Sequence, residues 1–151
     1  MINECNPKEK RTILGYFTDQ FGIPRSVFGP YTLYKRRTSV FLGPKISIDS
    51  PAPYSIGILL AVLKEPIIPS HSAVSLFGNY ATKNVLRLEK SELIRFIKGE
   101  VIMIDDSAIR TADAGSIIVR YAHFSVGGGF YKKGTLKLAF PFAMHEKLKY
   151  L

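Results

Sequence analysis

The chain has 151 residues, enough for one medium domain or two small ones, and 46% of them are apolar, which excludes a disordered chain. Its formal net charge of +9 makes nucleic acid the first partner to consider and an anionic membrane surface the second. The longest apolar run, IGILLAVL, is far shorter than the ~18 residues of a membrane-spanning helix, so we expect no membrane partner. The single cysteine excludes an intramolecular disulfide and fits a reducing, cytoplasmic setting.

The first third of the chain predicts a helix followed by a β-hairpin. The Asn-Pro pair at 6–7 is typical of a helix start, apolar residues then recur at helical spacing, and Gly22 is typical of a helix end. The stretch YTLYKRRTSVFLG (31–43) alternates and is rich in aromatic and β-branched residues. It predicts a hairpin that turns near the arginine pair 36–37. A further strand is expected over KISI (45–48).

The pattern in the middle of the chain leaves alternatives open. The segment YSIGILLAVLKE (54–65) fits either a short buried helix or two strands, and Gly57 favours a strand or a bulge. PIIPSHSA (66–73) has the composition of a connector. We therefore expect a domain boundary near residues 66–70.

The second half predicts a mixed sheet with one or two short helices. SELIRFIKGE (91–100) begins with a Ser N-cap and has Gly99 as a terminator, which predicts a helix. Strands are expected over 100–104, 116–122 and 134–140. A polar loop is expected over 105–115. The triple glycine 127–129 falls between the last two strands, where residues without a Cβ would allow a sharp turn and a close approach of RNA. The alternative is a plain bulged hairpin whose phenylalanines lie in the core.

Basic residues are concentrated in two stretches that contain no acid. Residues 25–45 contain five Lys and Arg, and residues 114–145 contain four. Stretches of one charge sign beside aromatic residues are typical of a phosphate-binding face with stacking platforms. For the Lys132-Lys133 pair a second interpretation stays open, because lysine also blocks edge-to-edge pairing of strands.

We find no motif for catalysis, a cofactor or a metal. The glycine run lacks the GK[ST] of a Walker loop and does not precede a helix. Three isolated histidines and one cysteine do not make a thiolate metal site. Asp105 and Asp106 could act as a carboxylate pair, but they follow a strand in a polar loop, where Asp usually makes turn hydrogen bonds. We therefore expect no catalytic residues, no cofactor and no metal.

Several short motifs together carry a family resemblance. They are PSHSAVSLFGN (69–79), LIRFIKGEVI (93–102), GSIIVRY (115–121) and SVGGG…GTLKLAFP (125–141). As a set they resemble the C-terminal PUA-like RNA-binding region of the Sun family of RNA 5-methylcytosine methyltransferases. LFGNYATKN (76–84) and the stretch 21–44 are also similar to a large-subunit ribosome-biogenesis factor, which places a small α/β domain before its PUA domain. Leu138 departs from the Sun-family pattern, in which Asn usually follows Leu-Lys.

The resemblance implies an α+β protein with a small N-terminal α/β domain over residues 1–68 and a PUA-like mixed β-barrel over residues 69–151. The catalytic domain of the family, its S-adenosylmethionine-binding loop and its catalytic cysteines have no counterpart in the sequence. We therefore expect a stand-alone, non-catalytic RNA-binding protein that recognises structured ribosomal or transfer RNA. It would be accessory to RNA modification or ribosome biogenesis, with an RNA methyltransferase or a ribosome-assembly protein as a further partner.

Two alternatives remain, a protein-interaction adaptor that docks on an RNA methyltransferase or a ribosomal protein, and a diverged enzyme. PUA-like domains use the surface between their first segment and their last strands. On that resemblance the predicted RNA-binding residues are Tyr80, Lys83, Asn84, Arg87, Arg120, Lys132, Lys133 and Lys137. Tyr80 could stack on an unpaired base. The competing interpretation packs Tyr80 in the core and makes Lys83 a solvated helix residue.

Overall fold

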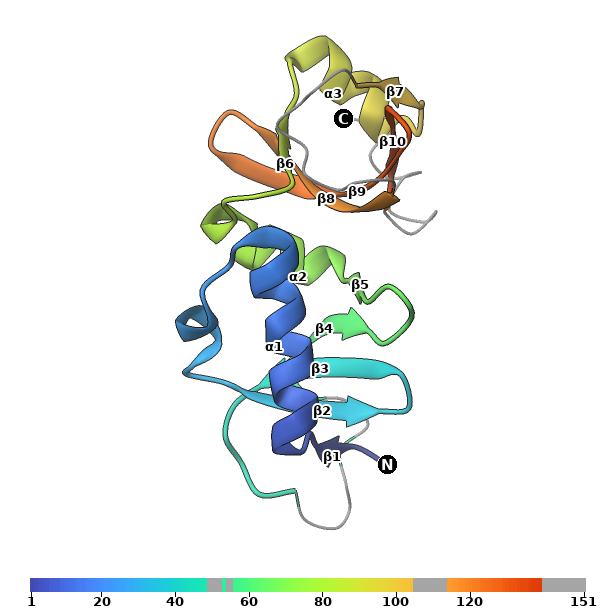
Figure 1. The fold of residues 1–151 in the computed structure, drawn as a ribbon. Helices are drawn as coiled ribbons and strands as arrows, with labels where there is room; N and C mark the ends of the chain where they lie inside the picture. Colours follow the sequence, from blue (N-terminus) through green and yellow to red (C-terminus); the bar gives the residue numbers. More distant parts are fainter. Residues whose placement is uncertain (49–52, 54–55, 105–113, 140–151) are drawn as a thin grey trace.

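The computed structural model describes residues 1–48, 53, 56–104 and 114–139. These residues form two five-stranded sheets, the first in the lower half of Figure 1 and the second in the upper half. The strand order is β1-β2-β3-β4-β5 in the first sheet and β6-β8-β9-β10-β7 in the second. The predicted loop over 105–115, with its aspartates, lies almost entirely outside the described residues.

The first sheet is an antiparallel meander with a helix across one face (Figure 1). Its strands are β1 (Asn3–Glu4), β2 (Thr32–Arg36), β3 (Ser39–Gly43), β4 (Ile58–Val62) and β5 (Ile68–Pro69). The covering helix is α1 (Pro7–Phe21), and the 3₁₀ turn η1 (Arg25–Phe28) follows it. Ile13, Phe17 and Phe21 of the helix share one buried core with Leu33 and Leu60 of the sheet.

The predicted helix and hairpin of this half are confirmed. Asn6 Oδ1 accepts a hydrogen bond from Glu9 N at 2.9 Å, Glu9 Oε2 accepts one from Asn6 N at 2.9 Å, and the helix ends at Gly22 with φ +68°. The hairpin turns at Arg37, which has φ +55°. The described part of 54–65 has neither the helix nor two strands but the single strand β4, preceded by Gly57 with φ +64°.

Two predictions for this half are wrong. Residues 45–48 form no strand, because the buried Tyr34 holds them instead: its hydroxyl donates to Pro44 O at 2.6 Å and accepts from Ile46 N at 3.3 Å. The connector over 66–73 contains β5 and the start of helix α2 (His71–Phe77). Ser70 caps that helix by accepting a hydrogen bond from Ala73 N at 2.9 Å.

The second sheet curls into a half-barrel, as expected for a PUA-like fold (Figure 1). Its strands are β6 (Val85–Arg87), β7 (Ile102–Met103), β8 (Ala114–Tyr121), β9 (Phe124–Lys132) and β10 (Thr135–Leu138). Strand β6 pairs with β8 in parallel, and the other pairs are antiparallel. Phe96, Ile117, Val119 and Leu136 form its buried core. Phe96 comes from helix α3 (Lys90–Ile97), whose N-cap is Glu89 and not the predicted Ser91.

The glycine run does not form the predicted turn but lies inside strand β9. The chain turns at Ala122 (φ +51°) before this strand and at Lys133 (φ +47°) after it. Helix α2 packs against the glycines, and a Cβ added to Gly128 would lie 3.6 Å from Val74 Cγ2. An added methyl group would therefore make only an ordinary contact with the helix at Gly128. The tighter contact is at Gly129, where an added Cβ would lie 2.5 Å from Leu136 Cδ1 of β10. The strand is also bulged, because Val119 pairs with Gly127 but Arg120 pairs with Ser125.

Helix α2 and the 3₁₀ turn η2 (Gly78–Tyr80) lie between the two sheets, and α2 contacts both β4 and β9. The side chain of Gln20, at the end of α1, donates to Ser116 O of β8 at 2.8 Å. The division at residues 68 and 69 into separate domains stays a prediction. None of the helices in the described ranges combines the length and the apolar character needed to cross a bilayer.

Candidate nucleic-acid interface

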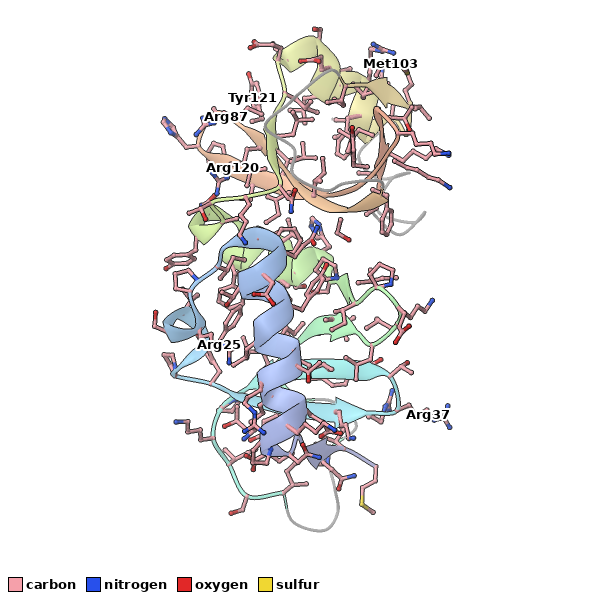
Figure 2. All side chains as sticks on the ribbon, viewed as in Figure 1. Arg25, Arg37, Arg87, Met103, Arg120 and Tyr121 are labelled. Carbon is pink, nitrogen blue, oxygen red and sulfur yellow. The ribbon has the colours of Figure 1, made fainter. Side chains whose placement is uncertain are left out.

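Two arginines meet at one end of the second sheet. Arg87 ends β6 and pairs in register with Arg120 on the neighbouring strand β8. With Asn79, Ala122 and His123 they line a cavity of about 310 Å³, which we call the arginine cleft. Figure 2 shows both arginines at the side of the sheet where the β8–β9 turn lies, away from Met103 of β7. No carboxylate from the described ranges lines the cleft.

The arginines are held by backbone carbonyls rather than by acids. Arg120 Nη2 donates to Gly78 O at 2.5 Å and to Ala81 O at 3.1 Å, and Arg87 Nη1 donates to Ala122 O at 3.2 Å. Arg120 Nε is buried and has no hydrogen-bond partner among the described residues. Burial first, and then the charge of Arg87, lower the pKa of Arg120 below its ordinary value. The cleft therefore carries two positive charges that favour an anion.

The local fold explains why the arginines converge. The bulge in β9 lies opposite Arg120, and bulges re-aim nearby side chains. The tight turn at Ala122 places the Ala122 carbonyl at the cleft, where it accepts a hydrogen bond from Arg87. On the other side, Ser125 Oγ donates to Asn79 Oδ1 at 2.8 Å and so ties η2 to the β8–β9 hairpin.

Two exposed aromatic residues adjoin cleft-lining residues in the sequence. Tyr80 follows the lining residue Asn79 and is 54% exposed, whereas Phe124 follows the lining residue His123 and is 69% exposed. The interpretation that places Tyr80 in the core is therefore wrong. Aromatic rings can stack on bases and guanidinium groups can bind phosphate, so these residue types are suited to RNA.

Lys83 and Asn84 form hydrogen bonds within the protein. Lys83 Nζ donates to Asp19 O at 2.8 Å, and the buried Asn84 donates from Nδ2 to Gln20 O at 2.6 Å. Both therefore satisfy free carbonyls at the end of helix α1, where a lysine charge is also favourable. Their predicted contact with RNA stays a prediction.

The three remaining predicted lysines are not brought together with the arginine cleft. Lys132 ends β9 and Lys133 forms the next turn, whereas the cleft lies at the start of that nine-residue strand. At about 3.3 Å per residue the two ends of the strand are roughly 26 Å apart. Lys137 lies on β10 opposite Phe130. These lysines are exposed, and their role in RNA binding stays a prediction.

Sequence reasoning missed Asn79, His123 and Phe124. The turn that places His123 and Phe124 contains no Gly, Pro, Asn or Asp, so the usual turn signal was absent, and the strand was expected to continue through Ala122. Asn79 lies in the motif LFGNYATKN (76–84), but it is its hydrogen bond with Ser125 that shows that it faces the β8–β9 hairpin.

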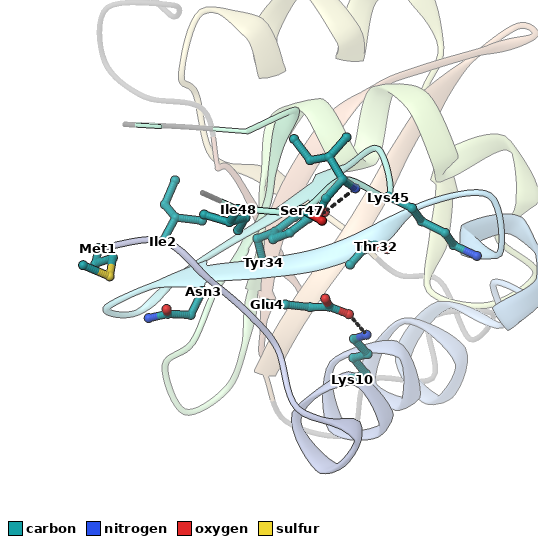
Figure 3. A pocket seen from close by; sticks show the side chains of 11 residues that line it. Met1, Ile2, Asn3, Glu4, Lys10, Thr32, Tyr34, Lys45, Ser47 and Ile48 are labelled. Atoms are coloured by element: carbon teal, nitrogen blue, oxygen red, sulfur yellow. Dashed lines mark hydrogen bonds and ion pairs between the residues drawn. The ribbon is translucent and has the colours of Figure 1, made fainter. Parts of the chain in front are cut away.

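The N-terminal half has a larger cavity of a different character. A hollow of about 910 Å³ lies between β1 and the segment 45–48, and Figure 3 shows Tyr34 and the Lys10–Glu4 ion pair in its wall. Among its described lining residues the one acid, Glu4, is already paired with Lys10 at 2.6 Å. Across the described ranges no three His, Cys, Asp or Glu side chains are grouped to hold a metal ion.

Cys5 is the one cysteine of the chain, and its thiol is buried. Burial, and secondly the charge of Glu9, raise the pKa of this thiol from 9.0 to about 11. Between pH 9 and 11 the unfolded chain releases the thiol proton while the folded chain keeps it, so the free energy of unfolding should fall with rising pH. Urea unfolding at pH 8 and pH 10.5 should show a smaller loss for Cys5→Ala than for the wild type. The same loss in both proteins would contradict the assigned shift.

The sequence comparison identifies the second half. Residues 83–141 match the family described as the Methyltransferase RsmF PUA domain, a match that spans the whole second sheet and includes both cleft arginines. No curated protein matches the chain. A PUA domain indicates RNA binding in the context of a methyltransferase. The C-terminal part of this chain is therefore a PUA-like region similar to that of a Sun-family methyltransferase.

Proposed function

We propose that this chain binds structured RNA, ribosomal or transfer, and serves RNA modification or ribosome biogenesis without performing chemistry itself. The observation that carries the proposal is the arginine cleft, in which two guanidinium groups converge without a carboxylate among the described residues. The two neighbouring positive charges repel each other, an anion between them relieves the repulsion, and RNA supplies phosphates.

The chemistry of the cleft suits RNA in two ways. A guanidinium group can form paired hydrogen bonds with phosphate oxygens, and it is more weakly hydrated than an ammonium group. The exposed rings of Tyr80 and Phe124 can stack on bases that a loop or bulge leaves unpaired. Folded RNAs present phosphates and unpaired bases next to each other.

The proposal assigns no catalytic role to Cys5. A thiol attacks as the thiolate, and the raised pKa of about 11 keeps this buried thiol protonated near neutral pH. Calorimetry that detects micromolar S-adenosylmethionine binding to this chain would contradict a non-catalytic role.

We expect RNA binding to depend steeply on salt. If about five phosphates are contacted, affinity for a folded transfer RNA should fall roughly a hundredfold or more between 50 and 200 mM salt, because counterions are released on binding. Fluorescence anisotropy of a labelled RNA at four salt concentrations measures the slope. An affinity that does not change over this range would rule out a phosphate-binding surface.

The adaptor alternative has one observation in its favour. Tyr31 and Leu76 are exposed beside an apolar groove of about 390 Å³ on the N-terminal half. Exposed apolar side chains around a groove are typical of protein contacts. Capture of a purified RNA methyltransferase or ribosomal protein, together with salt-independent behaviour towards RNA, would favour the adaptor.

A further inference from the structure

We propose that the arginine cleft is a discrete phosphate subsite that accepts the phosphate of one unpaired nucleotide, whose base stacks on Tyr80 or Phe124. This inference rests on the proposed RNA-binding function and specifies the class of ligand that its central site takes.

The donors of the cleft are only partly used within the protein. Arg120 Nη2 is occupied by two backbone carbonyls, which fix the guanidinium plane, but Nε is buried without a hydrogen-bond partner among the described residues. An unsatisfied buried donor is costly, and it leaves the charge of this guanidinium group incompletely compensated within the described part of the protein. Because the plane is already fixed, little side-chain entropy is lost when a ligand binds.

Neighbouring groups complete a site for an anion. Arg87 brings a second positive charge from the adjacent strand, and within the described residues it makes one hydrogen bond, to Ala122 O at 3.2 Å. Asn79 uses Oδ1 to accept from Ser125, which leaves its amide nitrogen as a donor at the cleft wall. His123 lines the same wall. Every polar group named here can donate a hydrogen bond, and none is a carboxylate.

Size and surroundings favour a nucleotide over a larger ligand. The volume of about 310 Å³ lies at the small end of the range of roughly 300–1,000 Å³ for ligand sites. Tyr80 and Phe124 adjoin its lining residues Asn79 and His123 in the sequence and are more than half exposed. A base within a continuous duplex cannot stack on them, whereas an unpaired base can. The combination therefore favours a loop, a bulge or a strand end.

The test follows the NMR signal of Arg120 Nε–Hε in the full chain, assigned with the Arg120→Lys variant. Inorganic phosphate and adenosine 5′-monophosphate are titrated at constant ionic strength. We expect saturable shifts, with the nucleotide binding about tenfold more tightly because its base stacks. Arg87→Gln should weaken both ligands by about tenfold, because one charged donor is lost. The matched control Arg11→Gln, which removes an exposed arginine from helix α1, should leave both affinities unchanged.

The outcomes separate this inference from the proposed function. A linear, unsaturable shift of the Arg120 signal, or equal losses in Arg87→Gln and Arg11→Gln, overturns the subsite. If RNA binding is salt-dependent but insensitive to Arg87→Gln, the subsite is wrong while the function stands; if the wild type does not bind RNA, the function itself fails. A 5′-phosphorylated trinucleotide that binds better than its 5′-hydroxyl counterpart identifies a terminal phosphate, whereas equal affinities identify an internal phosphodiester.

Discussion

Replacing Tyr80 and Phe124 together by alanine is expected to weaken binding of a hairpin RNA with an unpaired loop by tenfold or more. Stacking of a base on an aromatic side chain contributes ~1–3 kcal/mol, and both rings are exposed on residues that adjoin the cleft lining in the sequence. Binding of a fully paired duplex of the same length should change little, because its bases are not available for stacking. Fluorescence anisotropy with both labelled RNAs measures the two effects.

A matched pair of exposed aromatics serves as the control. Tyr31 lies on the N-terminal half, and Phe130 lies opposite Lys137 on the second sheet. Alanine at both positions should leave hairpin binding unchanged. A larger loss in this control than in the Tyr80 and Phe124 variant would move the RNA site to the lysine-bearing part of the sheet.

The largest effect on stability is expected for Gly57→Ala. Gly57 has φ +64°, and a Cβ there would lie 1.9 Å from Leu42 O and 2.7 Å from Gly43 Cα. Left-handed backbone costs roughly 1–2 kcal/mol for a residue with a side chain, and the clash with a paired strand adds to it. We expect the free energy of unfolding to fall by about 3 kcal/mol or more. Urea unfolding followed by circular dichroism measures the difference.

Gly128→Ala provides the same chemical change where the structure tolerates it. Its φ is not positive, and the nearest atom to an added Cβ is Val74 Cγ2 at 3.6 Å, an ordinary contact. The free energy of unfolding should therefore change by about 1 kcal/mol or less. Equal losses in the two variants would contradict the geometry assigned to Gly57.

Local sequence signals were sufficient to predict the elements whose structure depends on residues close together in the chain. The capping residues around α1 and the arginine turn between β2 and β3 involve neighbours within a few residues, so pattern and turn chemistry predict them. The PUA-like half was predicted from motifs, and the family match over residues 83–141 confirms that resemblance.

The glycine run shows where local rules fail. Three glycines between strands resemble a turn, but they lie inside β9, where helix α2, about 50 residues earlier in the chain, packs on the strand and β10 crowds Gly129. Tyr34 is a similar case. A strand was predicted over 45–48, but the main chain there bonds to the buried Tyr34 hydroxyl instead of to a neighbouring strand. Such tertiary contacts leave no periodic trace in the sequence.

The candidate site was predicted only in part for the same reason. Arg87 and Arg120 meet because β6 and β8 pair in parallel, a pairing between segments more than 30 residues apart. Basic character marked both arginines as candidates, but it also marked Lys83, which the structure places at the end of helix α1. Charge alone does not separate a lysine that caps a helix from one that binds phosphate.

The most direct test of RNA binding at the arginine cleft is ultraviolet crosslinking of the full chain to a hairpin RNA, followed by mass spectrometry of the crosslinked peptides. The account predicts crosslinks in the two segments that flank the cleft, 79–87 and 120–124, with Tyr80 and Phe124 as the modified side chains. Crosslinks confined to the lysine-bearing turn at 132–137, or to the β2–β3 turn of the first sheet, would contradict it.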